Sequence, residues 1–222
     1  MVIALIPARL GSQRLKQKNL RELAGVPLIT HAIRKCKQSA VFDQIWVNSE
    51  DAVFGEIALS ERVYFHQRPI ALGNNMATSE QYIAEFLETH ECEYLVQVHS
   101  IAPLLSVNDI IGFVAELEKK EVDCLLSTDM VQIECAYKGR PVNFSFSEKT
   151  NSQDLEPIQR ISWSITAWRR ETFLRAVSEG KCATYYGRVG FHSISPLAGY
   201  VIKTERDLQI AEALLPLVEN RS

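Results

Sequence analysis

Short apolar runs alternate with amphipathic stretches over the first 127 residues of the chain. The runs at 2–6, 44–48, 63–66, 94–98 and 124–127 have the length of strands, and the first is apolar throughout, as a strand buried on both faces should be. Such alternation predicts an α/β fold, a Rossmann-like and mostly parallel sheet with helices on both faces.

The stretches between these runs carry helix signals. Apolar residues recur on one face after Pro27, and proline suits the first turn of a helix. Further helices are predicted at 51–60, after a cap at Thr78 or Ser79, and at 106–120. Together these elements give the order βαβαβαβαβ.

The rhythm changes at 131–159, which is polar and contains Gly139, Pro141 and Pro157. Polar and apolar residues alternate within it at 142–146, so we expect an inserted hairpin or arm. Beyond it, the pattern predicts a strand at 161–168, a helix at 170–179 and a last helix from Glu205, capped by Thr204 together with Asp207.

Length and composition favour one folded domain over residues 1–222. Hydrophobic residues make up 46% and charged residues 23%, which is ordinary globular usage. A net charge of -3 provides no basic field, so we expect no nucleic-acid partner. No apolar stretch is long enough to span a membrane, and the first run is too short for a signal peptide, which predicts a cytoplasmic protein without a membrane partner.

Five cysteines are scattered along the chain without a Cys-x-x-Cys pair: Cys36, Cys92, Cys124, Cys135 and Cys182. Their odd number and wide spacing favour reduced thiols with structural roles over disulfides, a metal site or a catalytic thiol.

The segment 6–20 lies between the first predicted strand and the first predicted helix, and it is rich in basic residues. Ligands of parallel α/β sheets bind beyond the carboxyl ends of the strands, which is where this loop begins. Gly11 and Ser12 would let backbone N–H groups approach an anion, while Arg9, Arg14 and Lys18 could neutralise a triphosphate. A solvated basic loop is the simpler alternative for the charges alone.

The order of residues in this loop decides between the two interpretations. It matches neither the P-loop nor the dinucleotide-binding fingerprint. The segment Ile-Pro-Ala-Arg-Leu-Gly-Ser-Gln-Arg-Leu-Lys-Gln-Lys-Asn-Leu instead resembles the signature of the cytidylyltransferases that make CMP-sialic acid and related CMP-sugars. Weaker matches follow at 23–29, 47–51, 67–69, 77–80, 102–104 and 207–208, so the resemblance covers nearly the whole chain.

The resemblance implies a fold of the nucleotide-diphospho-sugar transferase type and a homodimer in which the arm at 131–159 crosses to the partner. It implies attack of a sugar hydroxyl on the α-phosphate of CTP, aided by Mg²⁺. It also implies a role in cell-surface polysaccharide biosynthesis. The acidic sugar would be a sialic acid-like nonulosonate or an octulosonate.

The resemblance also implies roles for individual residues. Arg9 and Lys18 would stabilise the pyrophosphate leaving group. The remaining nucleotide-binding candidates are Ala8, Gly11, Ser12, Arg14, Asn19, Ser49 and Arg68. His99, Gln153 and Lys203 are the candidates for the sugar side of the site. A guanylyl- or uridylyltransferase remains a further alternative.

Several positions depart from the family pattern, and the two expected to hold magnesium are among them. Family members carry an Asp-x-Asp pair that holds magnesium before the last helix, and Val201 and Lys203 fall at those positions here. A repositioned metal site, a metal handled mostly by CTP, and a homologue that binds nucleotide without turnover all remain open. Glu50 and Asp51 could be replacement carboxylates or simply acidic residues at a helix N-terminus.

Overall fold

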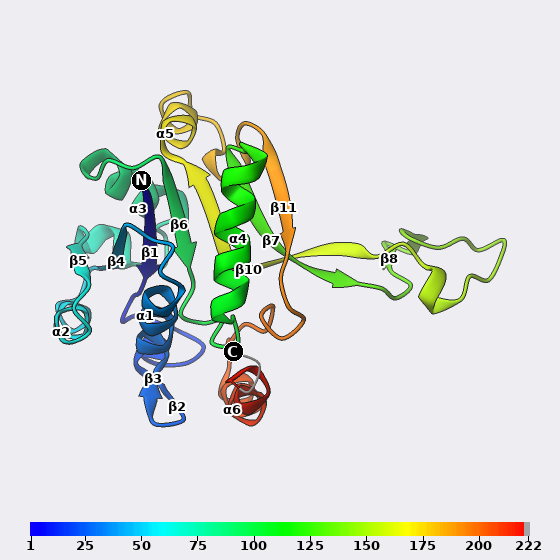
Figure 1. Ribbon diagram of the computed structural model, residues 1–222, viewed down its shortest axis with the longest axis horizontal. Helices are drawn as coiled ribbons and strands as arrows, with labels where there is room; N and C mark the ends of the chain where they lie inside the picture. The colour runs from blue at the N-terminus through cyan, green and yellow to red at the C-terminus, as the bar shows by residue number, and fades with distance from the viewer. Residues whose placement is uncertain (220–222) are drawn as a thin grey trace.

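A seven-stranded sheet forms the centre of the protein in a computed structural model, which describes residues 1–219 (Figure 1). In spatial order its strands are β11 (Val189–Ser193), β7 (Cys124–Val131), β10 (Ile158–Arg169), β6 (Tyr94–Val98), β1 (Val2–Pro7), β4 (Gln44–Ser49) and β5 (Tyr64–Gln67). β10 runs antiparallel to both of its neighbours, and the other pairings are parallel. The predicted mostly parallel sheet is therefore confirmed.

Helices cover both faces of this sheet, as predicted. They are α1 (Leu28–Ser39), α2 (Val53–Ser60), α3 (Ser79–Thr89), α4 (Val107–Lys120) and α5 (Arg170–Ser178), and a sixth helix, α6 (Glu205–Glu219), lies apart from the two faces. One core cluster joins α1, α2 and α4 to the sheet, and a second joins α3 and α5 to the opposite face. β1 contributes alternate residues to both clusters, which explains why its run is apolar throughout.

Side-chain caps define where three of the helices begin. Thr78 and Gln81 form a capping box at the start of α3, and Ser106 and Asp109 form another at the start of α4. Asp207 accepts hydrogen bonds from the backbone N–H and the hydroxyl of Thr204, at 2.8 and 2.9 Å. The predicted capping pair before the last helix is thus present.

α6 does not cover the main sheet but packs below its carboxyl edge. Leu208 and Ala211 of α6 share a third core cluster with Leu15, Leu23 and Leu28. In the segment before the helix, the N–H of Ile202 donates to the carbonyl oxygen of Ile101 at 2.8 Å. This bond holds residues 201–203 beside the loop that follows β6.

The arm extends β7 and β10 beyond the body of the molecule (Figure 1). Val131 still pairs with Ile158, and the excursion between them contains β8 (Ala136–Tyr137), β9 (Arg140–Pro141) and a short 3₁₀ turn (Ser152–Asp154). Lys138 and Gly139 both have positive φ, as a two-residue hairpin turn requires. An extended arm thus lies where the sequence places one.

β11 is the strand of the main sheet that the sequence did not predict; the two-residue strands β2 (Glu22–Leu23) and β3 (Val26–Pro27), which pair with each other, were not predicted either. β11 is short, contains a glycine and two polar residues, and lies at the edge of the sheet, where part of each side chain stays exposed. Such an edge strand has no continuous apolar run to mark it. Within residues 1–219 no helix is long and apolar enough to cross a membrane.

Candidate functional site

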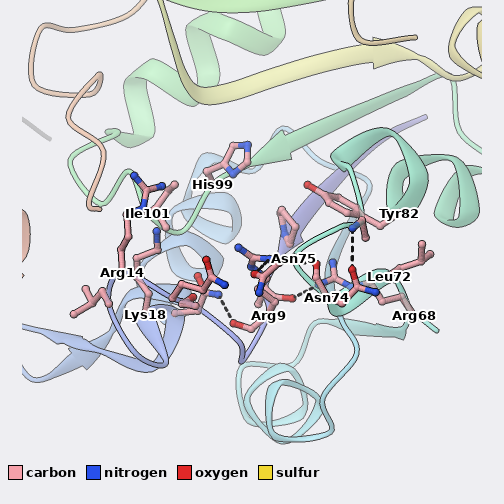
Figure 2. A pocket seen from close by; sticks show the side chains of 17 residues that line it. Arg9, Arg14, Lys18, Arg68, Leu72, Asn74, Asn75, Tyr82, His99 and Ile101 are labelled. Carbon is pink, nitrogen blue, oxygen red and sulfur yellow. Dashed lines mark hydrogen bonds between the residues drawn. The ribbon is translucent and has the colours of Figure 1, made fainter. Parts of the chain in front are cut away.

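A cavity of about 390 Å³ opens at the carboxyl edge of the sheet (Figure 2). β1, β4, β5 and β6 are parallel, so the loops that leave them meet at this edge. The lining side chains come from the loop after β1, the segment between β5 and α3, the first turns of α3, and the end of β6. The polar ones are Arg9, Ser12, Gln13, Arg14, Lys18, Asn19, Arg68, Asn74, Asn75, Tyr82 and His99.

Buried hydrogen bonds hold the loop after β1 in place. The N–H of Ala8 donates to the carbonyl oxygen of Asn48 at 2.9 Å. The amide of Asn19 donates to the carbonyl oxygen of Arg9 at 3.1 Å and accepts from the hydroxyl of Ser100 at 2.7 Å. Asn19 is buried, so its side chain anchors the loop to the end of β6.

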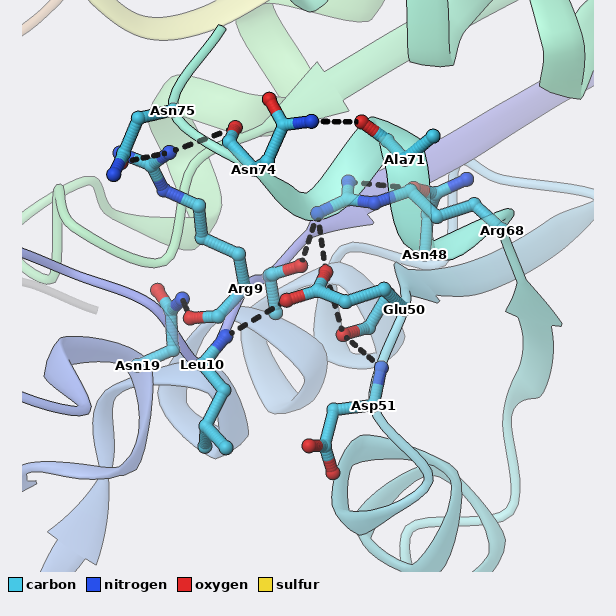
Figure 3. A network of polar contacts seen from close by, with 12 residues as sticks. Arg9, Leu10, Asn19, Asn48, Glu50, Asp51, Arg68, Ala71, Asn74 and Asn75 are labelled. Atoms are coloured by element: carbon cyan, nitrogen blue, oxygen red, sulfur yellow. Dashed lines mark hydrogen bonds and ion pairs between the residues drawn. The ribbon is translucent and has the colours of Figure 1, made fainter. Parts of the chain in front are cut away.

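Arg68 supports the same loop from below (Figure 3). Its guanidinium donates to Asn48 Oδ1 at 2.9 Å, to the carbonyl oxygen of Ala8 at 2.8 Å and to Glu50 Oε2 at 2.7 Å. Glu50 Oε1 accepts in turn from the N–H of Leu10 at 3.1 Å. Only 3% of Arg68 is exposed, so this ion pair is an internal clamp between three strand ends.

Glycine at position 73 lets the next segment pack against that clamp. A Cβ added to Gly73 would stand 2.4 Å from the side-chain Cδ of Glu50, which no side chain can tolerate without moving the carboxylate. Gly73 ends the 3₁₀ helix Ile70–Gly73, which leads into Asn74 and Asn75 at the cavity wall. The close approach therefore places two amides beside the basic loop.

Cations gather on one side of the cavity. Lys18 Nζ donates to the carbonyl oxygen of Ile202 at 3.2 Å. Burial lowers the pKa of Lys18, and the nearby charges of Arg14, Arg9 and Lys203 lower it further, while Asp207 opposes them. Within the described chain no acidic side chain lines this cavity. An anion placed here would relieve the repulsion among the cations.

Arg9 bridges the basic loop to the opposite wall. Its guanidinium donates to Asn75 Oδ1 at 3.0 Å and to the carbonyl oxygen of Asn74 at 3.3 Å. Arg9 is exposed enough to leave donors for a ligand, unlike Arg68. Arg9, Arg14 and Lys18 thus reach the same space from one loop, as the sequence predicts for phosphate binding.

A polar chain lies at the end of β6. The hydroxyl of Tyr82 donates to Gln97 Oε1 at 3.1 Å, and the amide nitrogen of Gln97 contacts His99 Nε2. Burial raises the pKa of Tyr82 to about 12, while burial and the charge of Lys18 lower the pKa of His99 to about 4. Sequence reasoning found His99 but missed Tyr82 and Gln97; the available signal was a glutamine within an apolar strand.

Three nucleotide-binding candidates have surroundings other than those expected. Ser49 is fully buried, and its hydroxyl accepts from the N–H of Asp51 at 3.2 Å, so it shapes the start of α2. Gly11 borders a separate surface hollow, and an added Cβ would meet nothing within 4 Å. Arg68 lines the cavity, but its two terminal nitrogens already donate to Asn48, Ala8 and Glu50, while its buried Nε has no partner among residues 1–219.

Two candidates for the sugar side also lie outside the cavity. Gln153 is exposed on the arm, where its carbonyl oxygen accepts from the Gln132 amide at 3.0 Å. Lys203 is exposed as well, and its N–H donates to Asp207 Oδ2 at 2.9 Å. Lys203 still lies close enough to Lys18 to affect its pKa, whereas Gln153 belongs to the arm that leaves the body.

The carboxylates near the site have structural partners. Asp51 Oδ1 accepts from the N–H of Val53 at 3.0 Å, which caps α2, and Glu50 is paired with Arg68. The helix-terminus interpretation of Asp51 therefore agrees with its contacts. Among residues 1–219, no three His, Cys, Asp or Glu side chains come together as a metal site.

Comparison with known proteins identifies relatives of the whole described fold. The family model described as Cytidylyltransferase matches residues 3–215. N-acylneuraminate cytidylyltransferase of Streptococcus agalactiae serotype III is 29% identical over 193 residues, covering 82% of this chain and 47% of the relative. Pseudaminic acid cytidylyltransferase of Campylobacter jejuni is 30% identical over 115 residues, or 48% of each protein. The chain thus spans about half the length of the curated relatives it matches.

Solved structures share the fold at low sequence identity. CMP:2-keto-3-deoxy-manno-octonic acid synthetase complexed with CTP superposes with a TM-score of 0.73 at 16% identity, covering 97% of this chain and 98% of that one. 4-diphosphocytidyl-2C-methyl-D-erythritol synthase from Anaerococcus prevotii gives a TM-score of 0.68 at 12% identity, with coverage of 97% and 98%. This architecture is therefore shared by proteins that differ greatly in sequence.

Proposed function

Because the chain belongs to the cytidylyltransferase family, we propose that it transfers the cytidylyl group of CTP to a hydroxyl of an acidic sugar and releases pyrophosphate. One observation carries the proposal: Arg9, Arg14 and Lys18 line a single cavity at the carboxyl edge of the sheet, with no acidic side chain among the described lining residues. The names of the relatives favour a nonulosonate as the acceptor, and the fold neighbour favours an octulosonate as the alternative.

The reaction forms one bond and breaks another at the α-phosphorus. The sugar hydroxyl oxygen attacks the α-phosphorus, the bond from that phosphorus to the bridging oxygen breaks, and the hydroxyl proton passes to water. Pyrophosphate leaves with the electron pair of the broken bond. We assign stabilisation of its developing charge to Arg9 and Lys18, with Arg14 beside them.

The opposite wall suits the nucleoside. Asn74 and Asn75 offer amide and backbone groups that can hydrogen-bond the edge of a pyrimidine, and Leu72 and Ala77 provide apolar contact. Asn19 and Arg68 support this arrangement by fixing the loop and the strand ends. Ala8 and Ser12 also line the cavity.

The family resemblance implies Mg²⁺, but the residues present do not fit a protein-held ion. Magnesium requires oxygen ligands, and Val201 and Lys203 stand where the resemblance places carboxylates. Glu50 is bound to Arg68, and Asp207 caps α6. We therefore assign charge compensation of the triphosphate to the protein cations.

The direct test measures pyrophosphate released from CTP. Purified protein is incubated with CTP and a panel of nonulosonic and octulosonic acids, with added magnesium and separately with a chelator. The proposal predicts release that depends on one class of sugar acid and is lost in Lys18→Met. Absence of release with every acid, in both conditions, contradicts transfer activity.

A second candidate function is nucleotide binding without turnover, and the cationic Lys203 beside Lys18 favours it. In that case calorimetry gives CTP binding that a chelator does not change, and no sugar acid yields pyrophosphate. Calorimetry with GTP and UTP decides the nucleotide base in the same experiment.

We further propose that the arm makes a homodimer and brings Gln153 toward the partner's cavity. Four apolar side chains of the arm are exposed in the single chain: Ile133, Tyr137, Val142 and Phe146. Exposed apolar groups gathered on one projecting segment favour burial against a second copy. Sedimentation of the protein and of Phe146→Ser tests this; a monomer at all concentrations contradicts it.

A further inference from the structure

Gln97 places a polar side chain inside an apolar layer. Only 2% of it is exposed, and it stands on β6 two residues after Leu95, on the face that packs against α3. A buried amide left without partners is destabilising, because the hydrogen bonds it loses to water are not replaced. Its contacts to Tyr82 and His99 are therefore the hydrogen bonds that satisfy the amide, and the chemistry of the two partners determines which group donates in each.

The hydroxyl of Tyr82 fixes the orientation of the amide. This hydroxyl is protonated, because burial raises its pKa to about 12, and within residues 1–219 the acceptor recorded for its proton is Gln97 Oε1. If the amide were rotated by half a turn, Gln97 would donate to Tyr82 and the hydroxyl proton would lose that acceptor. The orientation with Oε1 toward Tyr82 satisfies both groups.

The amide nitrogen of Gln97 then faces His99 Nε2. An amide nitrogen only donates, so His99 Nε2 must accept with its lone pair. A neutral imidazole carries one N–H, which leaves the proton on Nδ1. The neutral form of the ring agrees with its low pKa, which results from burial and from the charge of Lys18.

We propose that Tyr82 and Gln97 are positioning residues that hold His99 as the Nδ1–H tautomer, so that His99 donates a hydrogen bond to an oxygen of the bound ligand. The identity of that ligand rests on the proposed function. Figure 2 shows His99 on the cavity wall between Lys18 on one side and Tyr82 on the other. Phosphate and sugar-acid oxygens are both suitable acceptors there.

This assignment excludes a role of His99 as general base. A general base must offer a free lone pair to the hydroxyl it deprotonates. The lone pair of Nε2 is occupied by Gln97, and Nδ1 carries the proton. His99 therefore orients the ligand and does not accept the proton of the sugar hydroxyl.

The test is a long-range ¹H–¹⁵N spectrum of the histidine rings in the full chain near neutral pH, with His99 assigned by its loss in His99→Gln. The expected result is an unprotonated Nε2 and a protonated Nδ1. Gln97→Glu replaces the donor with a carboxylate acceptor, so the proton should move to Nε2. Gln44→Glu makes the same change at the other end of the sheet, next to Trp46, and should leave His99 unchanged.

CTP and a sugar acid are then added separately to identify the acceptor. A shift of the Nδ1–H signal with CTP alone assigns a nucleotide oxygen, and a shift only with the sugar acid assigns a sugar oxygen. Gln97→Glu should weaken that ligand on the order of tenfold. A proton on Nε2 in the unmodified protein, or no shift with any ligand that calorimetry shows to bind, overturns the inference. Failure of CTP to bind at all would instead contradict the proposed function.

Discussion

Arg68 and Lys18 are both cations at the carboxyl edge of the sheet, yet their surroundings are opposite. Arg68 is buried and meets an anion, since Glu50 lies 2.7 Å away and two further oxygens accept from the same guanidinium. Lys18 donates to one carbonyl oxygen, the charges of Arg9, Arg14 and Lys203 repel it, and the charge of Asp207 opposes that repulsion. Within residues 1–219, Arg68 contacts a carboxylate and Lys18 does not.

This difference separates scaffold from binding site. A cation whose donors are mostly bound to protein oxygens stabilises the fold and has little left to offer a ligand. A cation whose neighbours repel it raises the free energy of the empty site, and an anionic ligand recovers that energy. Basic residues near a loop therefore indicate a ligand only when their own acceptors are missing.

The largest expected effect is the loss of the internal clamp. Arg68→Met removes the partner of Glu50 and leaves a buried carboxylate unpaired, which should lower the free energy of unfolding by about 3–5 kcal/mol. Urea unfolding measures the change. Arg34→Met is the matched control, because Arg34 forms an exposed pair with Glu61 and should cost about 0–1 kcal/mol. Equal losses in the two variants would show that Arg68 is not a clamp.

Lys18→Met, in contrast to Arg68→Met, should weaken ligand binding without lowering stability. Removing a charged hydrogen bond costs about 1.5–3 kcal/mol, so CTP affinity should fall about ten- to a hundredfold. Stability of the free protein should stay equal or rise, because a cation repelled by its neighbours disappears. Calorimetry with CTP and urea unfolding of the same sample give both quantities. Unchanged CTP affinity would remove Lys18 from the proposed site.

The lowered pKa of Lys18 predicts how CTP affinity depends on pH. The folded pKa lies below the usual 10.5, and a bound triphosphate favours the ammonium form. Affinity should be highest below the folded pKa and fall as pH rises through it. Without ligand, the repulsion that destabilises the fold is present below the folded pKa and disappears as pH rises toward 10.5. Calorimetry over an alkaline pH series should show this decline, and Lys18→Met should abolish it.

The lowered pKa of His99 predicts a loss of stability in acid. Its pKa falls from 6.5 in the unfolded chain to about 4 in the folded protein, so the unfolded chain binds the proton first. Stability should therefore decrease as pH falls from about 6.5 to about 4 and lose nothing more from this group below that. Acid unfolding of His99→Gln should begin at lower pH than that of the unmodified protein. The same onset in both would show that the ring is not buried in its neutral form.

The first half of the chain shows how far sequence reasoning reaches. The apolar runs of β1 and β6 and the capping residue Thr78 are local signals, and the elements they predict are present. The basic loop was also recognisable, because its residues lie within one segment. These features depend on neighbours in sequence.

Features that depend on distant partners were not predictable. No local signal indicates that Arg68 pairs with Glu50, eighteen positions away in the sequence. The sequence alone therefore places Arg68 among the nucleotide-binding residues. Ser49 looked like a ligand residue but is buried under the same clamp. The contact between Tyr82 and Gln97 forms only when α3 packs on β6 and brings the hydroxyl to the amide, so the sequence alone does not reveal it. Whether a polar group is satisfied is a tertiary property.

Substitution of Lys203, a cation near the cavity that does not line it, should have the smallest effect on CTP affinity. Lys203 is exposed and affects Lys18 through its charge without lining the cavity, so Lys203→Ala should weaken CTP only about two- to fivefold, and less at high salt, where exposed charges are screened. Lys16→Ala is the matched control, since Lys16 borders the outer hollow of the same loop. Calorimetry at low and high salt distinguishes the two variants. A loss as large as that of Lys18→Met would mean that Lys203 contacts the phosphates, and equal small losses would mean that only net charge matters.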